Sequence, residues 1–501
     1  MKRSICLFLL GMLFSSLSLF SQTGMRYHLS FDPEEQYIHV SLSLSGLSEE
    51  ATILRMPVWA PGYYIILDYP KNVVDFEAFD PDGHPLIWEK SGKNGWVVHH
   101  GNCHDVTVSY RVYANAHSVA ECMVTEEKAF IPGNGVYMHI EEKKNMPVTV
   151  HFTLPDTWKH ISTGLKRMEE TNTFYAADFD LLYDSPVYIG NQTLIHFTHE
   201  GHEYELAMET PEGFEEQDFV GDLKKMISSC TALIGDVPYD NYCFILMGRG
   251  GGGLEHFNSQ ACFTYGTYHF TTREMYNSFL SFITHEYFHL YNVKTIRPIE
   301  LGPFDYDKEV FTPLLWISEG FTVYYELPIL LRAGIINKDY FLKEMSAVIR
   351  KVEGKNGKNH MSLRQSSYDI WLNFFNNNAN GADTRISYYD KGPIIGLLMD
   401  IEIRQMTDNR RSLDDVMRAL YWQYYKEKDR GFTEEEFWQV CAEVAGQPLM
   451  EMRRYVDTTS AIDYAKYAAY AGLRIDDDWN LSVVEGCSGL ALRIRESILG
   501  K

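Results

Sequence analysis

Two histidines one helical turn apart, with a glutamate after the first, place the strongest constraint on how this chain folds. The segment His285-Glu286-Tyr287-Phe288-His289 must be helical for both imidazoles to face the same way, because residues i and i+4 share one face of an α-helix. Two such rings can hold one Zn²⁺ while the glutamate lies beside a metal-bound water. The motif therefore predicts a metal-dependent hydrolytic site on a helix.

A third protein ligand is expected on a later helix. A catalytic zinc has three protein ligands and keeps a fourth position open for water. Glu319 is the candidate, and Glu326 lies two turns further along the same face, where its carboxylate can accept the other ring N–H of a ligand histidine. The alternative for each residue is a helix carboxylate that faces water.

A glycine-rich segment follows a predicted strand. Residues 242–247 form an apolar run typical of a buried strand, and the glycines after it, Gly252 and Gly253 among them, lead to Glu255. Glycines at such a place let a substrate backbone approach closely. A phosphate-binding loop is the rival interpretation, but no Gly-Lys-Ser/Thr follows, and the first charged residue after the glycines is an acid.

A tyrosine stands at the predicted start of another helix. Residues 386–392 precede an apolar run with helical character over residues 393–406, which places Tyr389 at the mouth of that helix. A phenol there can donate a hydrogen bond to the oxyanion that develops when hydroxide attacks a peptide carbonyl. The polar segment 373–383 just before it is either a border of the same cleft or a plain surface loop.

These motifs resemble the glycyl aminopeptidase family of zinc metallopeptidases, gluzincins with a thermolysin-like catalytic domain. The resemblance extends over residues 26–473. It rests on the histidine helix and its exit at 285–298, the Gly-Leu-Glu-His segment at 253–256, the Trp-Ile-Ser-Glu-Gly-Phe segment at 316–321, and Pro-Val-Trp-Ala-Pro-Gly-Tyr-Tyr at 57–64.

The resemblance implies how a substrate would be held. Glu255 would bind the free α-ammonium group of a peptide beside Gly252 and Gly253, and Tyr389, which fits Tyr-x-Lys-Gly, would be the oxyanion donor. A small first residue, glycine or alanine, would be preferred. More distant aminopeptidases have asparagine where this chain has His256, which leaves the details of amine recognition open.

The predicted reaction is metal-assisted peptide hydrolysis. One Zn²⁺ per chain, held by His285, His289 and Glu319, would lower the pKa of its water towards about 7 and polarise the scissile carbonyl. Glu286 would be the general base, and the substrates would be peptides with a free amino terminus. Two alternatives stay open: a zinc endopeptidase on the same scaffold, and a catalytically silent peptide-binding relative.

The periodicity of the chain changes near residue 205. Residues 25–205 alternate apolar and polar positions between Asp-Pro, Pro-Gly and Asp-Gly turns, which predicts an all-β, sandwich-like domain. Segments with helical spacing dominate residues 206–473, the predicted thermolysin-like zinc peptidase domain. The β-domain would support or shield the site, with carbohydrate binding as the alternative. Residues 474–501 form a tail too short for the PDZ domain that family members commonly carry.

The amino terminus has the features of a secretory signal peptide over residues 1–21. Lys2 and Arg3 precede a short apolar run at 5–14 and a Ser/Leu tract that ends at Ser21. The run is too short for a good membrane-spanning helix, and no later segment has the pattern of one. The expectation is an exported protein, periplasmic or secreted, that does not insert into a membrane after cleavage.

Charge and cysteine content exclude several other classes. A net charge of −23 argues against nucleic-acid or anionic-membrane partners. The cysteines after Cys6 are widely spaced and contain no Cys-x-x-Cys pair, so they predict neither a zinc finger nor a dense disulfide framework. Cys103 and Cys122 are the candidate pair for one disulfide. None of these features predicts the oligomeric state.

Overall fold

The computed structural model describes residues 24–210, 213–264, 270–373 and 380–500. The predicted signal peptide at 1–21 and residues 374–379 of the polar segment lie outside these residues. Within the described ranges, no helix has the length and apolar character needed to cross a membrane.

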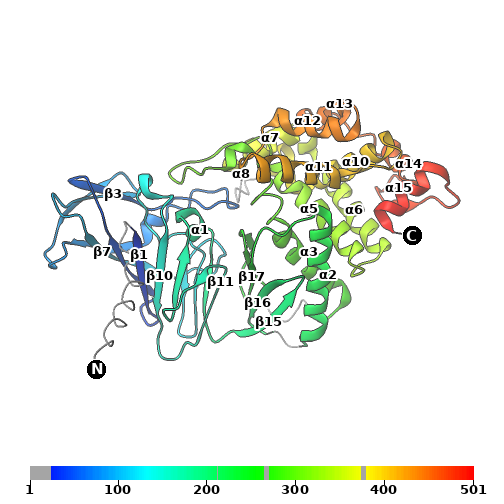
Figure 1. Ribbon diagram of the computed structural model, residues 1–501. Helices are drawn as coiled ribbons and strands as arrows, with labels where there is room; N and C mark the ends of the chain where they lie inside the picture. The colour runs from blue at the N-terminus through cyan, green and yellow to red at the C-terminus, as the bar shows by residue number, and fades with distance from the viewer. Residues whose placement is uncertain (1–23, 211–212, 265–269, 374–379, 501) are drawn as a thin grey trace, which may run out of the picture.

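The N-terminal half consists mainly of β-strands, as the alternating pattern predicts (Figure 1). In the strand Met25–Asp32, for example, Tyr27 and Leu29 are buried while Arg26 and His28 are exposed. The largest sheet has the order β12-β13-β10-β1-β2-β7-β4. Its strands are Lys166–Arg167, Thr173–Ala176, Val148–Thr153, Met25–Asp32, Tyr37–Leu44, Val106–Tyr113 and Val73–Phe79.

Two smaller sheets share the apolar core of this large sheet, which gives the half its sandwich-like character. The first has the order β3-β6-β5, with strands Ala51–Arg55, Gly95–His99 and Ile87–Ser91. The second has the order β11-β14-β9-β8, with strands His160–Thr163, Val187–Gly190, Ala129–Ile131 and Met123–Val124. A short helix, α1 (Phe179–Tyr183), closes the same core.

A five-stranded sheet joins the two halves of the chain. Its order is β15-β16-β17-β19-β18, with strands Thr193–His199, His202–Met208, Asn241–Met247, Ser259–Phe263 and Gly253–Glu255. The boundary predicted at residues 205–206 falls inside β16, which pairs with β15 on one side and with β17 on the other. The hairpin β15–β16 alternates like the strands before it, so its sequence pattern does not show which sheet it joins.

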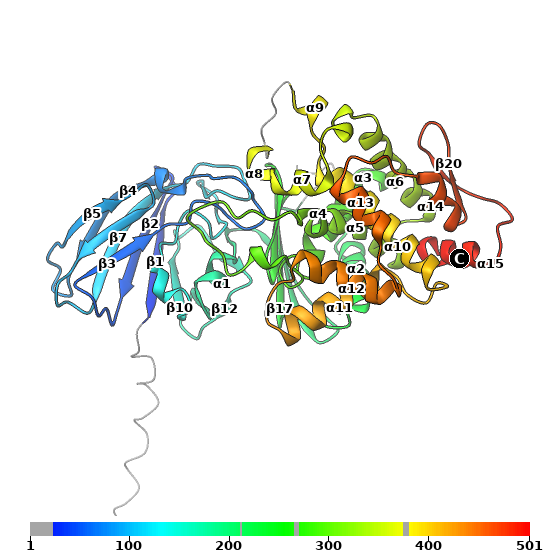
Figure 2. The same ribbon diagram turned by 90° about the horizontal axis from the view of Figure 1, so that it is seen from above.

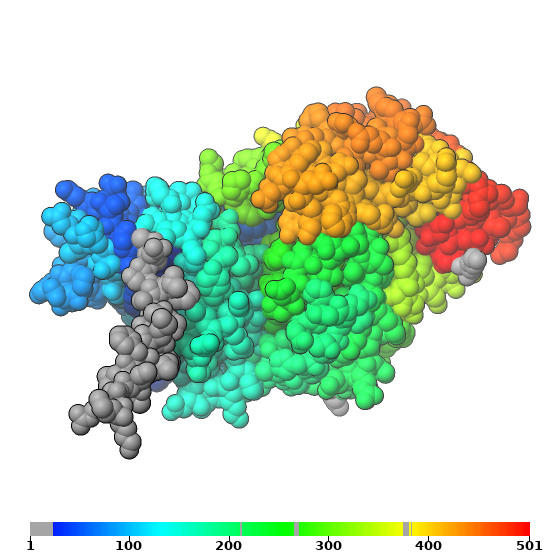
Figure 3. All heavy atoms as spheres, viewed as in Figure 1, coloured from blue at the N-terminus to red at the C-terminus, as the bar shows by residue number. Residues whose placement is uncertain are grey.

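Both faces of the five-stranded sheet are covered. In β17, Phe244 and Leu246 belong to the core shared with the helices, whereas Ile245 and Met247 pack with Phe130 of the N-terminal half. Successive strand residues point to opposite faces, so a strand covered on both sides is a continuous apolar run, as it is here. Figure 3 shows the N-terminal half, coloured blue to cyan, in contact with the green part of the C-terminal half.

The C-terminal half is mainly helical (Figure 2). Its helices up to the metal-binding motif and just beyond are α2 (Glu216–Ile234), α3 (Arg273–Phe288), α4 (Leu315–Ser318) and α5 (Gly320–Arg332). They are followed by α6 (Lys338–Glu353), α7 (Leu363–Tyr368), α8 (Ile370–Asn373), α9 (Gly381–Thr384), α10 (Tyr388–Met406), α11 (Leu413–Leu420), α12 (Glu434–Ala445), α13 (Met450–Asp457) and α14 (Tyr464–Tyr470).

The predicted tail is folded against the helical domain. It contains the hairpin β20 (Leu473–Ile475) and β21 (Leu481–Val483), followed by α15 (Gly489–Leu499). The backbone N–H of Leu481 donates to Oγ of Ser346 in α6 at 2.9 Å, and Ile494 of α15 is fully buried in the helical core. The tail therefore completes the helical core instead of forming a separate unit.

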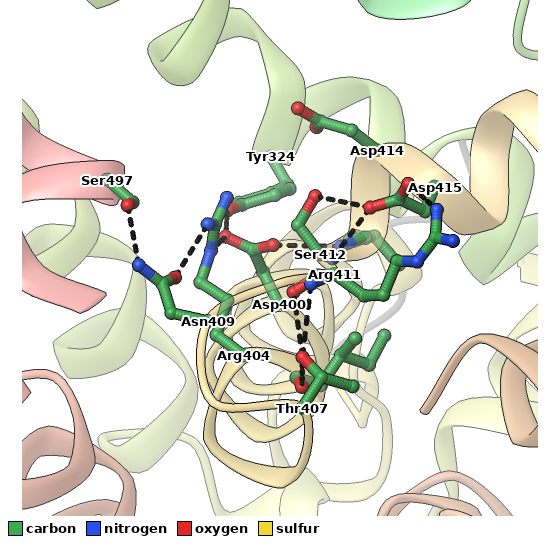
Figure 4. A network of polar contacts seen from close by, with 12 residues as sticks. Tyr324, Asp400, Arg404, Thr407, Asn409, Arg411, Ser412, Asp414, Asp415 and Ser497 are labelled. Atoms are coloured by element: carbon green, nitrogen blue, oxygen red, sulfur yellow. Dashed lines mark hydrogen bonds and ion pairs between the residues drawn. The ribbon is translucent and has the colours of Figure 1, made fainter. Parts of the chain in front are cut away.

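A buried carboxylate connects three helices of this domain (Figure 4). One oxygen of Asp400 in α10 accepts hydrogen bonds from Nε of Arg404 at 3.0 Å and from the hydroxyl of Tyr324 in α5 at 3.2 Å. Its other oxygen accepts from the backbone N–H of Leu413, the first residue of α11, at 2.9 Å. Because Asp400 is 2% exposed and Arg404 7%, the pair is shielded from water.

The cysteine pair proposed from the sequence is not formed. Cys103 and Cys122 are both free, and the five other cysteines after Cys6 are free as well. Cys122 is buried, and its Sγ donates to the backbone oxygen of Asn134 at 3.3 Å. Sequence separation says little about distance in a sandwich whose strands pair out of order.

Replacing Asp400 tests the importance of the buried pair. Asp400→Ala should lower the free energy of unfolding by about 3–5 kcal/mol, because the buried guanidinium of Arg404 loses its counter-charge. Arg493→Ala is the control: it removes an ion pair with Asp408 whose side chains are 51% and 68% exposed, and the loss should stay under about 1 kcal/mol. Urea denaturation of both variants gives the two values, and equal losses would contradict the expectation.

Candidate metal centre and active site

His285 and His289 lie at the C-terminal end of α3, and Glu319 lies at the junction between α4 and α5. The Nε2 atoms of the two histidines are 3.0 Å apart. Oε2 of Glu319 lies 3.5 Å from Nε2 of His285 and 3.2 Å from Nε2 of His289. The three predicted ligands therefore point at one another.

The spacing of these atoms fits a zinc ion. Tetrahedral bonds of about 2.0–2.2 Å separate neighbouring ligand atoms by about 3.3–3.6 Å, close to the three distances observed. Oε2 of Glu319 is buried and has no hydrogen-bond donor among the described residues. Burial alone would raise the pKa of this carboxyl, but His289 and His285 outweigh burial and lower its pKa. A carboxylate held in its charged form beside two imidazoles suits a divalent cation.

Hydrogen bonds on the far side of each imidazole fix how the rings are oriented. Nδ1 of His285 donates to Oε1 of Glu326 at 2.8 Å, and the other oxygen of Glu326 accepts from the hydroxyl of Ser281 at 2.6 Å. Nδ1 of His289 donates to the backbone oxygen of Asn292 at 2.8 Å. With the proton on Nδ1, each Nε2 presents a lone pair to the centre.

The side chain of Asn292 is a further contributor that the sequence analysis did not single out. Its amide nitrogen donates to the backbone oxygens of Ile317 at 2.8 Å and Ser318 at 3.0 Å. It thus ties the exit of α3 to the junction that carries Glu319. Asn292 lies within the 285–298 segment that resembles the family, and this was the only sequence signal for it. The helical spacing of the metal-binding motif does not assign a role to an asparagine at this position.

Two glycines allow α5 and α10 to touch beside the metal centre. A Cβ at Gly320 would lie 2.5 Å from Cα of Gly392, and a Cβ at Gly392 would lie 2.6 Å from Cα of Gly320. Because Gly320 follows Glu319 directly, this contact brings the first turn of α10 next to the metal centre. Tyr388 and Tyr389 are in that turn.

Tyr389 lies on the same side as the metal ligands. The ring centroids of Tyr389 and His285 are 6.5 Å apart, and the backbone N–H of Tyr389 donates to the capping hydroxyl of Ser387 at 3.1 Å. Burial, and then the charge of Glu319, raise the pKa of Tyr389 well above its usual value, so the phenol keeps its proton. A protonated phenol is a hydrogen-bond donor.

Two other tyrosines surround the centre and were not selected from the sequence. Tyr388 is 1% exposed, and its ring centroid lies 4.7 Å from that of Tyr389. Tyr64 comes from the N-terminal half and is also 1% exposed. Burial, and then the charge of Glu319, raise the pKa of both phenols. Tyr64 falls within the 57–64 segment, whose sequence gave no hint of an active-site role.

Glu286 packs against the edge strand β18 and has a carboxylate oxygen within 4.8 Å of a ring nitrogen of His289. It is 4% exposed, and a Cβ at Gly253 would overlap its Oε1 atom, which explains the need for glycine there. Burial raises the pKa of Glu286 to about 7, against the opposing effect of His285 and His289. A carboxylate with such a pKa can both accept and return a proton near neutral pH.

Glu255 is the last residue of β18 and lies beside Glu286. The carboxylates of Glu255 and Glu286 and a ring nitrogen of His289 have atoms within 4.8 Å of one another. Glu255 is 4% exposed. Gly252 directly precedes β18, and a Cβ at this position would lie 3.2 Å from Cγ2 of Val119. The predicted substrate-binding residues therefore form one edge of the site.

His256 contacts the N-terminal half. Its Nδ1 lies 3.1 Å from Oδ1 of Asp184, which also accepts from Nζ of Lys294 at 2.7 Å.

Of the predicted polar segment 373–383, Asn373 lies at the end of α8, where its side-chain oxygen accepts a hydrogen bond from Arg385 at 2.5 Å. Residues 374–379 lie outside the described part of the chain.

Comparison with protein families agrees with the geometry. Residues 26–191 match the M61 peptidase N-terminal domain, and residues 278–395 match the M61 glycyl aminopeptidase domain. The two matches together cover more than half of the chain. The fold and the site define a zinc metallopeptidase. The chain belongs to the M61 glycyl aminopeptidase family.

Solved structures show the same architecture. An aminopeptidase N family protein from Idiomarina loihiensis is 27% identical, with a TM-score of 0.84 over 90% of this chain and 79% of that one. An M1 zinc metallopeptidase from Deinococcus radiodurans is 13% identical, with a TM-score of 0.54 over 88% of this chain and 94% of that one. Legionella pneumophila aminopeptidase A, solved with aspartic acid, is 13% identical. Its TM-score is 0.52 over 86% of this chain and 49% of that one.

The last two structures share the fold with this chain. The comparison with curated proteins found no match.

Replacing Glu326 tests how far the orientation of His285 matters. Glu326→Ala should weaken zinc binding roughly 10- to 100-fold, because Nδ1 of His285 loses the acceptor that holds its ring. Glu326→Gln keeps an acceptor oxygen and should lose less. Competition with a chromophoric chelator at fixed pH measures both affinities, and a Glu326→Ala variant with the affinity of the wild type would contradict the role.

Proposed function

We propose that this zinc metallopeptidase is an exported aminopeptidase that removes small first residues, glycine or alanine, from peptides with a free amino terminus. One observation carries the proposal: Glu255, a buried carboxylate, ends the edge strand β18 within 4.8 Å of Glu286 and His289. A carboxylate so close to the hydrolytic group can bind an ammonium group one residue away from the bond that is cut.

The peptide would lie along β18. This strand pairs on one side with β19 and is the outer strand of the five-stranded sheet, so its other edge can accept an extended peptide. The peptide would then end at Glu255, which limits cleavage to the first residue.

Glu286 is the proposed general base. His285, His289 and Glu319 would hold the zinc, which would supply Lewis acidity and a water of lowered pKa. The carboxylate of Glu286 would accept a proton from the attacking water and then pass it to the nitrogen of the leaving amine. Burial raises the pKa of this carboxyl above its usual value, which favours its action as a proton carrier.

Tyr389 is the proposed donor to the oxyanion. Its phenol is kept protonated by burial and lies near His285. Loss of one such donor typically costs about 3 kcal/mol of transition-state stabilisation. Export is proposed from the composition of residues 1–21, and detection of the mature protein outside the cytoplasm is its test.

Two variants separate the base from the ligands. Glu286→Gln should keep the zinc, because this carboxylate is not among the three convergent ligands, yet lose most of its peptidase rate through loss of the proton acceptor. Glu319→Ala should lose zinc first. Elemental analysis and peptide hydrolysis are measured on the same preparations. If both variants keep zinc equally and Glu286→Gln stays fully active, the roles are wrong.

Replacing Glu255 tests its proposed role in binding the ammonium group of the substrate. Glu255→Ala should lower kcat/KM for unblocked glycyl and alanyl peptides, because the substrate ammonium then enters a buried site without its carboxylate partner. The quantity to compare is the rate ratio of free to N-acetylated peptides in both proteins, with zinc content as the control. A wild-type enzyme that cleaves acetylated peptides as fast as free ones would instead be an endopeptidase on this scaffold.

A further inference from the structure

A tight turn of the N-terminal half reaches the proposed amine site. The backbone N–H of Tyr63 donates to the oxygen of Ala60 at 3.0 Å, which closes a four-residue turn. Proline in the second position and glycine in the third are typical of a type II turn, which requires a positive φ at the third residue. Pro61 and Gly62 hold these positions, and φ of Gly62 is 86°.

This turn ends against the carboxylate of Glu255. A Cβ at Gly62 would lie 2.6 Å from Oε1 and 2.8 Å from Oε2 of Glu255, and 2.8 Å from Cδ1 of Leu254. Real Cβ atoms essentially never approach other heavy atoms this closely. The backbone of Gly62 therefore packs directly against the carboxylate of Glu255. A larger residue at position 62 cannot fit without moving that carboxylate.

The turn is held firmly by both halves of the chain. The indole N–H of Trp59 donates to the backbone oxygen of Asp305 at 2.8 Å, and the backbone N–H of Val58 donates to the oxygen of Tyr306 at 2.9 Å. The oxygen of Trp59 accepts from the hydroxyl of Tyr183 in α1 at 2.7 Å. Trp59 is fully buried, so the turn cannot shift without breaking these contacts.

The residues after Glu255 are held by the N-terminal half as well. Asp184, which follows α1, accepts hydrogen bonds from Nδ1 of His256 at 3.1 Å and from the backbone N–H of Phe257 at 2.9 Å. The end of β18 is thus fixed at the carboxylate by Gly62 and just beyond it by Asp184. Figure 1 shows a blue loop of the N-terminal half that extends towards the peptidase half.

We propose that the N-terminal domain is part of the amine-binding site, and that Gly62 is a positioning residue which sets where the carboxylate of Glu255 meets the substrate's ammonium group. The inference rests on the proposed role of Glu255. In a buried site the attraction between two charges depends strongly on their separation, and a carboxylate that is 4% exposed cannot be compensated by water when it is displaced.

Glycine hydroxamate and acetohydroxamate are the probes. Both carry the hydroxamate group that chelates zinc, and they differ only in the ammonium group. The ratio of their inhibition constants therefore measures recognition of the amine separately from metal binding and from turnover. The wild-type enzyme should bind glycine hydroxamate more tightly than acetohydroxamate.

Gly62→Ala should reduce this preference roughly 10- to 100-fold, the cost of misplacing a binding group by about 1 Å. Gly83→Ala is the matched control. Gly83 has φ of 82° in the same half of the chain, and a Cβ there meets nothing within 4 Å, so the variant imposes the same backbone strain without the contact. Gly83→Ala should keep the wild-type ratio, and thermal unfolding and zinc content are recorded for both variants.

A double variant shows whether the effect passes through Glu255. With Glu255→Ala already present, Gly62→Ala should change the ratio by less than about twofold, because the group that it displaces is gone. A Gly62→Ala enzyme with the wild-type ratio would overturn the inference. So would a loss of preference that is just as large with Glu255→Ala already present.

A milder variant decides the matter if Gly62→Ala does not fold. Tyr183→Phe keeps the ring but removes the hydroxyl that holds the oxygen of Trp59, and it should lower the ratio in the same direction; an unchanged ratio would overturn the inference. The proposed function fails separately. If the wild-type enzyme does not distinguish the two hydroxamates, Glu255 does not bind the ammonium group and the proposed function is wrong. If Glu255→Ala loses the preference but Gly62→Ala keeps it, only the proposed role of Gly62 is wrong.

Discussion

The contact between Gly320 and Gly392 is the constraint on which the active site depends. Helices α5 and α10 meet there at backbone distance, with no side chain between them. Glu319 precedes one glycine by one residue and Tyr389 precedes the other by three, so the approach of the two backbones sets the place of a metal ligand and of a phenol together. The buried network around Asp400 holds the same two helices further along. Any residue with a side chain at either glycine would move the predicted metal ligand away from the proposed oxyanion donor.

Much of the site could be predicted from sequence because its spacing is helical. His285 and His289 share a face at i and i+4, and Glu319 and Glu326 share one two turns apart, so four positions follow from the geometry of a single helix type. Asn292, Tyr388 and Tyr64 could not be found in this way. Their positions depend on how separate elements pack, and in sequence each is a polar or aromatic residue among many.

The predicted boundary at residues 205–206 falls inside β16 for a related reason. The hairpin β15–β16 has the alternation of the preceding strands, yet it begins the sheet that carries β18 and Glu255. Alternation records that a strand has a buried face, but it does not record which neighbour buries that face. The all-β character of the first half and the helical character of the second are local properties, and both were predicted. The tail is the opposite case: its short hairpin and α15 gain their stability by packing on the peptidase core.

The five-stranded sheet is buried on one side by helices and on the other by the N-terminal sandwich. Ile245 and Met247 would face water if the sandwich were absent, and Phe130 would lose its cover at the same time. Apolar surface shared in this way couples the stability of two regions that sequence patterns separate. The halves are therefore expected to melt in a single cooperative transition, and the peptidase half expressed alone would carry an aggregation-prone sheet face in place of a functional enzyme.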